Sequence, residues 1–256
     1  MKSIIVSCIS ALCFASSVLA ADNAVFAERE AKIERAALRF EAEPLAEQVA
    51  AIDNDLAATP KDPALLYLRA FAYYAEATVA RGQKDKQVSV THLESAGKIL
   101  EQIKDATWEA EAMALHGYVL NQLIGIKGGM SAMKLGPQSS ALLGQAGEKA
   151  PNSPRVLFFR GESLVTTPEM WGGDVAQGIK LLEQASTAFE SQPANAPLHW
   201  GHAESLAWLG IAKQKKGDLA GARAAWEQAL AAEPAYGWVK HVLLPSIAKA
   251  TGKSAK

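Results

Sequence analysis

The chain has 256 residues, of which 21% are charged and 49% hydrophobic, as is typical of a folded protein. Its 26 basic and 27 acidic side chains nearly balance, which argues against nucleic-acid binding because that function requires a basic stripe. The length suits one or two compact domains, or a single continuous array of repeats.

Residues 1–20 have the pattern of a secretory signal peptide. Lys2 provides the positive start, an apolar stretch follows, and residues 18–20 end in the small residue of a cleavage site. We therefore expect an exported, periplasmic protein whose mature chain begins near Ala21. No later apolar run reaches the roughly 18 residues that a membrane helix requires, so we expect no membrane insertion of the mature chain.

Both cysteines, Cys8 and Cys13, lie in this signal segment. Lipidation is the alternative to simple cleavage, but Cys13 follows Leu12 rather than a small residue, and Cys8 comes too early in the apolar stretch. Once the signal is removed, the mature chain has no cysteine. The absence of cysteine from the mature chain excludes disulfides, thiolate metal sites and cysteine nucleophiles.

Residues 21–62 predict an N-terminal capping hairpin of two helices. Apolar residues recur at near-helical spacing up to about Arg39, and Pro44 can begin a second helix that ends before Pro60. The first unit of a repeat array has no neighbour on one side, so the array needs such a cap.

Four further helix pairs are predicted in residues 63–236. Each pair has a small residue at one position of its first helix and an alanine at the matching position of its second. Small residues let helix axes approach to about 8–10 Å, so these positions should mark the helix crossings. We predict that Gly210→Leu or Ala229→Leu overpacks a crossing and costs about 1–3 kcal/mol. The small residues are Ala70, Gly117, Gly161 and Gly210, and the alanines are Ala96, Ala146, Ala185 and Ala229.

The last pair, residues 203–236, carries the clearest pattern. Gly210 is small where the helices cross, Trp226 fills the groove beside it, residues 217–218 make the turn, and Pro234 ends the second helix. This arrangement resembles a tetratricopeptide (TPR) repeat, a helix–turn–helix unit of about 34 residues.

The resemblance implies an all-α fold, a right-handed TPR-like solenoid of about five antiparallel helix hairpins. Residues 63–236 would form four TPR-like units, and residues 237–256 a C-terminal capping helix and tail. The first three units contain extra residues between their helices, at about 79–90, 124–138 and 165–173. Such insertions lie along one edge of a solenoid and can build a binding surface.

The insertions can be interpreted in two ways. A longer surface loop is tolerated at little cost in free energy, so the first two are either functional or merely permitted. The third contains a proline, a methionine, two glycines and Trp171. Trp171 either caps the end of the helix pair or presents an aromatic surface to a ligand.

The TPR resemblance also implies a concave groove that binds peptides or helices. On this chain the groove positions combine aromatic rings with hydrogen-bonding side chains, which suits a protein or peptide partner. The alternative is that the protein's own N-terminal helices fill the groove and bury the tyrosines. The predicted partner-binding residues are Tyr67, Phe71, Tyr74, Tyr118, Asn121, Arg155, Phe158, Glu162 and Trp171.

No catalytic motif stands out in the sequence. His199 and His202 are three residues apart with Glu204 close behind, a spacing that could hold a metal such as zinc. The same residues serve equally well at the start of a helix, and no further ligand follows from the sequence. We therefore expect no enzymatic activity, no cofactor and no metal site.

Two functions remain. The first is a non-catalytic periplasmic adaptor that holds a protein or peptide in the aromatic groove. The alternative is a small-molecule-binding accessory component of a solute transport system, because periplasmic TPR proteins associated with TRAP-type transporters are similar in overall plan. An enclosed cavity beneath Trp171, lined by the insertions, would favour the alternative, and an open, water-filled groove would favour the adaptor.

Overall fold

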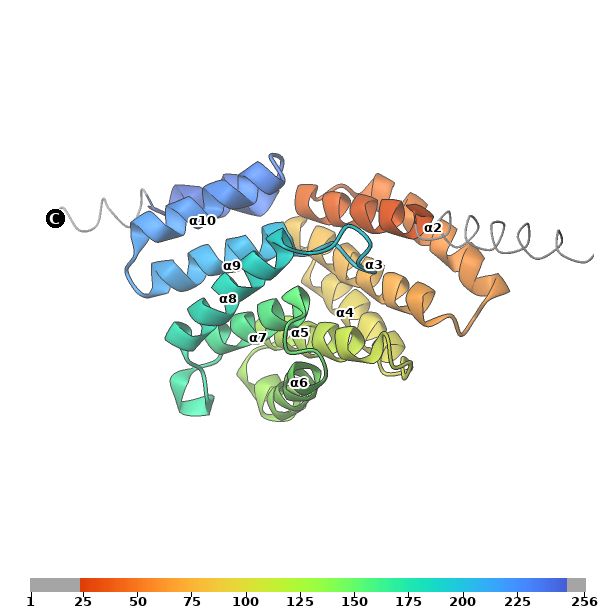
Figure 1. Ribbon diagram of the computed structural model, residues 1–256, viewed down its shortest axis with the longest axis horizontal. Coiled ribbons are helices and arrows are strands. Elements are labelled where there is room, and N and C mark those ends of the chain that lie inside the picture. The colour runs from red at the N-terminus through yellow and green to blue at the C-terminus, as the bar shows by residue number, and fades with distance from the viewer. Residues whose placement is uncertain (1–23, 248–256) are drawn as a thin grey trace, which may run out of the picture.

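The protein is all-α, as the computed structural model in Figure 1 shows for the described residues, 24–247. Within that range no residue is in a strand, and the helices pack as successive antiparallel pairs. The predicted fold class is confirmed, and the arrangement is consistent with a helical repeat. The expected signal peptide, residues 1–20, lies outside the described residues, as does the end of the chain after residue 247.

The pairs follow the chain in order. The closest partners are α3 with α4, α5 with α6, α7 with α8, and α9 with α10, while α3, α5, α7 and α9 also contact one another in sequence. After a first helix at residues 24–39, the elements are α2 (Ala42–Ala58), α3 (Pro63–Gly82), α4 (Lys86–Leu100), α5 (Glu109–Lys127), α6 (Gly129–Lys149), α7 (Pro154–Thr166), a 3-10 turn η1 (Glu169–Trp171), α8 (Val175–Glu190), α9 (His202–Lys215), α10 (Leu219–Ala232) and a π-helical turn η2 (Val239–Leu243).

Five helices begin at a side chain that caps them. In each, a carboxylate or hydroxyl oxygen accepts a hydrogen bond from a backbone N–H of the first turn, which stabilises a helix by about 1 kcal/mol. Two of these helices also have proline at their first position, where its missing N–H costs nothing. The capping residues are Asp62, Asp85, Ser153, Asp174 and Asp218.

Glycines occupy the closest approaches within the last three pairs. A Cβ atom added to Gly117 would lie 2.7 Å from Leu143 Cγ, and one added to Gly161 would lie 2.8 Å from Leu182 Cγ. At Gly210 the nearest atom, the indole nitrogen of Trp226, would be 2.2 Å away. These distances are too short for any larger residue, so the predicted small-residue crossings are confirmed at these three positions.

The first two insertions lengthen helices rather than form loops. Only residues 83–85 separate α3 from α4, and only Gly128 separates α5 from α6. Continued helix satisfies the backbone hydrogen bonds of the added residues locally, which a loop over the surface does not. The third insertion is different, because residues 167–174 leave the helix and form η1 before α8 begins.

The first helix reaches the other end of the chain. The Arg39 guanidinium donates two hydrogen bonds of 3.1 Å to the carboxylate of Glu233, which follows α10. Leu38 packs in the same apolar cluster as Leu206 and Tyr236. In Figure 1 the N-terminal helices, red and orange, accordingly lie beside the blue C-terminal helices at the top of the molecule. The first helix therefore contacts the last pair and joins the two ends of the described chain.

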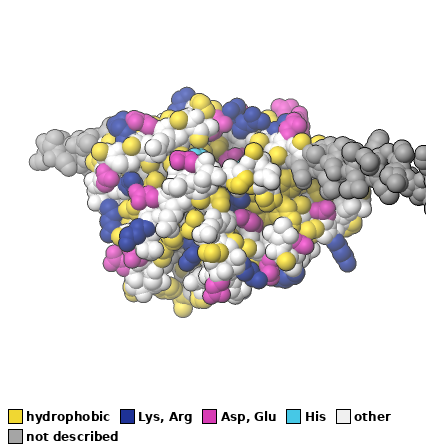
Figure 2. All heavy atoms as spheres, in the orientation of Figure 1, with side chains coloured by type: hydrophobic (Ala, Val, Ile, Leu, Met, Phe, Trp, Pro, Cys, Tyr) yellow, Lys and Arg dark blue, Asp and Glu magenta, His cyan; other side chains and the backbone are white. Residues whose placement is uncertain are grey.

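The surface is mixed in charge. On the face shown in Figure 2, Lys and Arg side chains alternate with Asp and Glu, and neither sign gathers into a stripe. Among the described residues, no helix is long and apolar enough to cross a membrane.

Candidate functional site

Seven of the nine predicted partner-binding residues are buried. They are Tyr67, Phe71, Tyr74, Tyr118, Arg155, Phe158 and Glu162. The Phe71 ring stacks on Trp200 at a centroid distance of 3.9 Å, and Tyr67 contacts Trp108 at 5.4 Å. Instead of facing an open groove, these residues are covered by other segments of the same chain, as in the alternative that the protein fills its own groove.

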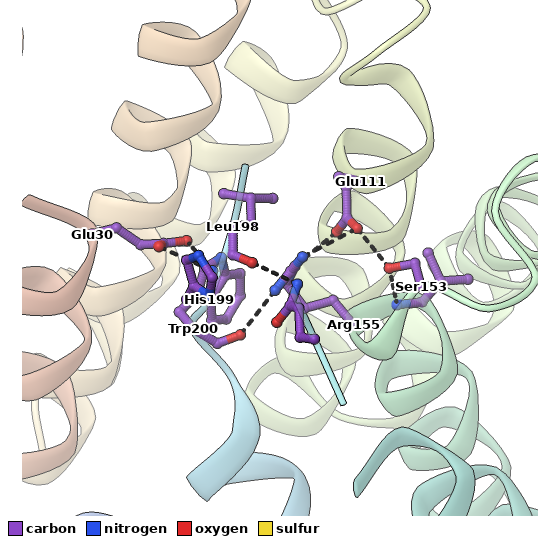
Figure 3. Close-up of polar contacts among 9 residues, drawn as sticks. Glu30, Glu111, Ser153, Arg155, Leu198, His199 and Trp200 are labelled. Atoms are coloured by element: carbon purple, nitrogen blue, oxygen red, sulfur yellow. Dashed lines mark hydrogen bonds and ion pairs between the residues drawn. The ribbon is translucent and has the colours of Figure 1, made fainter. Parts of the chain in front are cut away.

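Arg155 joins the segments that fill this region. Its guanidinium donates to the Glu111 carboxylate at 3.0 Å and to the backbone carbonyl of Trp200 at 3.2 Å, while the Ser153 hydroxyl donates to Glu111 at 2.6 Å. Figure 3 shows Arg155 between these partners, with the Glu30 carboxylate accepting the backbone N–H of His199 nearby. Arg155 therefore joins α5, α7 and the segment before α9. Because its side chain is buried, the guanidinium is not accessible to a partner.

Five of the nine predicted residues line cavities. Asn121, Glu162 and Trp171 line a cleft of about 970 Å³, and Tyr74 and Tyr118 line a neighbouring cavity of about 430 Å³. The cleft lies among the C-terminal end of α5, the first half of α6, the end of α7 and the turn that carries η1. Arg81, Gln122 and Trp208 line both, so the two cavities are neighbours.

The turn after α7 holds two large apolar side chains at the cleft. The Pro168 carbonyl accepts hydrogen bonds from the backbone N–H groups of Trp171 and Gly173, at 2.9 and 3.1 Å, and Gly172 adopts a φ of 92° that other residues rarely reach. The turn is thus fixed by its own backbone. Trp171 is 54% exposed and Met170 is 88% exposed, although both line the cleft.

The charged side chains that line the cleft are one acid, Glu162, and one cation, Arg81. Glu162 is buried, accepts a hydrogen bond of 3.2 Å from the Asn121 side chain, and has its pKa raised to about 8 by burial. The Arg81 guanidinium donates to the side chains of Gln122 and Thr78. No carboxylate among residues 24–247 forms an ion pair with Arg81. The cleft therefore offers a guanidinium to an acidic ligand.

Sequence reasoning missed Arg81 and Trp208 as cavity residues. Arg81 falls within the insertion at residues 79–90, so that insertion is the feature of the sequence that could have indicated it as a cavity residue. Trp208 lies on α9, and no feature of the sequence distinguishes it from the other partly buried aromatic residues of the chain.

The paired histidines form no metal site. His199 uses its backbone N–H to bond Glu30, and the His202 ring stacks on Phe189 at a centroid distance of 5.4 Å. Among residues 24–247, no group of three or more His, Cys, Asp or Glu side chains could hold a metal ion.

Stability is expected to fall as the pH rises from about 6.5 to 8. Burial raises the pKa of Glu30 to about 7 and that of Glu162 to about 8, above the ordinary 4.5 of the unfolded chain. In this window the native state binds more protons than the unfolded state, so each titrating carboxyl lowers the free energy of unfolding by up to about 1.4 kcal/mol per pH unit. Below about 6.5, the lowered pKa values of buried His116 and His202 act in the opposite direction.

Urea denaturation at several pH values measures this dependence. Glu162→Gln should flatten the decline between pH 7 and 8, whereas Glu227→Gln, at an exposed position of α10, should leave it unchanged. A wild-type stability that is constant or rises across the window would contradict the expectation.

Comparison with known proteins gives a likeness of fold. No family model matches the chain, and no curated protein sequence matches it either. Among solved structures, the HusA haemophore from Porphyromonas gingivalis is similar, with a TM-score of 0.51 and 21% sequence identity over 73% of this chain and 94% of the haemophore. At this identity the likeness shows the fold alone.

Proposed function

We propose that the protein binds a flat, mainly apolar organic molecule with acidic groups in the cleft beside Trp171. The observation that carries the proposal is that all three insertions contribute to this one cleft. Arg81 comes from the first, residues 124–137 from the second, and Trp171 with its turn from the third. The shared lining supports the small-molecule alternative over the adaptor, although the cleft is open to solvent rather than enclosed as that alternative expected.

The chemistry of the lining supports a planar ligand. A volume of about 970 Å³ is near the top of the range of small-molecule sites, about 300–1,000 Å³. Trp171 supplies an aromatic face for stacking, Met170 adapts its shape to a neighbour, and Arg81 can bind a carboxylate through charge-assisted hydrogen bonds. Large apolar side chains left in water beside such a cleft commonly mark a binding surface.

Haem is the first candidate ligand. The protein with the similar fold is described as a haemophore. A porphyrin is flat and apolar and carries carboxylates, which matches the lining. The described residues that line the cleft include no histidine, cysteine or tyrosine, and Met170 is the one sulfur-bearing residue among them. We infer that ring stacking and the carboxylates carry the affinity, and that iron coordination is not required.

Titration with haemin and with metal-free protoporphyrin tests the proposal. We expect both porphyrins to bind with affinities within about tenfold of each other, followed by absorbance and by quenching of tryptophan fluorescence. Trp171→Ala should weaken both by at least about tenfold, since aromatic anchors of a binding site commonly contribute that much. Met170→Ala should weaken them less.

Met130→Ala is the matched control, because Met130 is 90% exposed and does not line the cleft. It should bind as the wild type does. Absence of any spectral change with either porphyrin would overturn haem as the ligand, and an unchanged affinity in Trp171→Ala would overturn the cleft as its site.

We further infer a non-catalytic, periplasmic carrier with the domain division given by the sequence: a signal at 1–20, a capping hairpin at 21–62, four TPR-like units at 63–236 and a C-terminal cap at 237–256. The order of the helix pairs and their glycine crossings support the TPR-like plan. Mass spectrometry of the mature chain purified from the periplasm tests its start near Ala21.

A further inference from the structure

The smaller cavity has a composition of its own. Its volume is about 430 Å³, and it lies among the end of the first helix, the C-terminal half of α3, α5, α9 and the segment after α10. Six aromatic side chains form its walls together with aliphatic residues. They are Phe40, Tyr74, Tyr118, Trp208, Tyr236 and Trp238, of which Trp208 also lines the cleft.

A buried acid faces this cavity. Glu204 is 9% exposed, and its Oε1 atom accepts hydrogen bonds from the hydroxyl of Tyr74 and, at 2.8 Å, from that of Tyr118. Among residues 24–247, no hydrogen bond reaches its Oε2 atom and no cation forms an ion pair with it. Burial raises the pKa of this carboxyl, and the hydrogen bonds from Tyr74 and Tyr118 and the charge of Arg81 oppose that rise. One carboxyl oxygen is therefore available to a hydrogen-bond donor inside the cavity.

The mouth of the cavity carries the opposite charge. Arg81 and Lys84, at the C-terminal end of α3, line the cavity and are exposed to solvent. The cavity thus has an acid within it, aromatic walls, and two cations at the exposed end of α3.

We propose that this cavity is a second binding site, for a small molecule with an ammonium group at one end of an apolar body and an acidic group at the other. The ammonium would donate to Glu204 Oε2 and lie against the rings of Trp208 and Trp238, which attract cations through their π-systems. The acidic group would lie at Arg81 and Lys84. The inference rests on Glu204 and Lys84, which do not line the cleft, although Arg81 and Trp208 line both cavities.

Calorimetric titration of the wild-type protein with three probes tests the charge pattern. Aminohexanoate has both groups, hexylamine only the ammonium, and hexanoate only the acid. We expect aminohexanoate to bind most tightly and hexanoate at least about tenfold more weakly, because hexanoate gives Glu204 no donor. Equal affinities for aminohexanoate and hexanoate, or no binding of aminohexanoate, would overturn the proposal.

Two variants test which residues bind the ammonium group and the acidic group of the ligand. Glu204→Gln should weaken aminohexanoate and hexylamine by about tenfold or more, while Glu227→Gln, on the exposed side of α10, should change neither. Lys84→Gln, at an exposed position with no role in the core, should weaken aminohexanoate about threefold and leave hexylamine unchanged. This second variant keeps the test decisive if Glu204→Gln fails to fold.

The two sites are distinguished by measuring porphyrin binding on the same Lys84→Gln protein. An unchanged porphyrin affinity with weakened aminohexanoate supports separate sites. Loss of selectivity among the three probes, with porphyrin binding intact, would overturn the second site alone.

Discussion

Arg155→Met is expected to destabilise the folded protein by about 3–5 kcal/mol, the usual consequence of removing one partner of a buried ion pair. Arg155 is 2% exposed and binds both Glu111 and the Trp200 carbonyl. Methionine fills similar space but donates no hydrogen bond, so the Glu111 carboxylate would keep only the hydrogen bond from Ser153 and the Trp200 carbonyl would lose that of Arg155. The segment before α9 would lose its hydrogen bond to α7.

Urea denaturation compares this variant with two others. Arg223→Met removes an exposed ion pair with Glu227, whose atoms are 3.8 Å apart, and should cost at most about 1 kcal/mol. The double variant Arg155→Met with Glu111→Met should recover much of the loss, since it removes the unpaired charge as well. A loss below about 1 kcal/mol for Arg155→Met would show that the contacts of Arg155 contribute little to stability.

Gly210→Leu is expected to cost about 3 kcal/mol or more, at or above the upper end of the ordinary overpacking range. Its Cβ would lie 2.2 Å from the indole nitrogen of Trp226, and the rest of the leucine side chain adds to the clash. Trp226 cannot move aside easily, because it is fully buried and donates a hydrogen bond of 2.9 Å to the Ala207 carbonyl. The α9–α10 pair would have to separate.

Gly144→Ala is the matched control for this prediction. Gly144 lies inside α6, where a Cβ would meet no atom within 4 Å, so alanine should stabilise the helix by about 0.5–1 kcal/mol. Thermal unfolding followed by circular dichroism measures both variants. A Gly210→Leu protein that melts near the wild-type temperature would mean that α9 and α10 do not cross at this residue.

Local sequence determined the helices of this protein and their pairing. Apolar spacing, prolines, and the capping residues Asp174 and Asp218 fix where helices begin, since these effects act within a turn or two. The glycines at the crossings are visible for the same reason: the partner helix follows within about 30 residues of sequence, so one repeat contains both sides of the contact. The sequence likewise shows that the insertion around residues 165–173 contains Trp171, a residue that is unusual in a connecting segment.

Only the tertiary structure decided which of those residues line a cavity. Glu30 bonds a backbone group 169 residues away, and Arg39 bonds an acid 194 residues away. No periodicity reports a contact at such separation, so the sequence could not show that the first helix contacts the last pair. Contacts with Trp108 and Trp200 likewise bury Tyr67 and Phe71, and hydrogen bonds to Glu111 and Trp200 hold Arg155 in the core. The aromatic turn at Trp171 and the carboxyl of Glu204 instead line the two cavities.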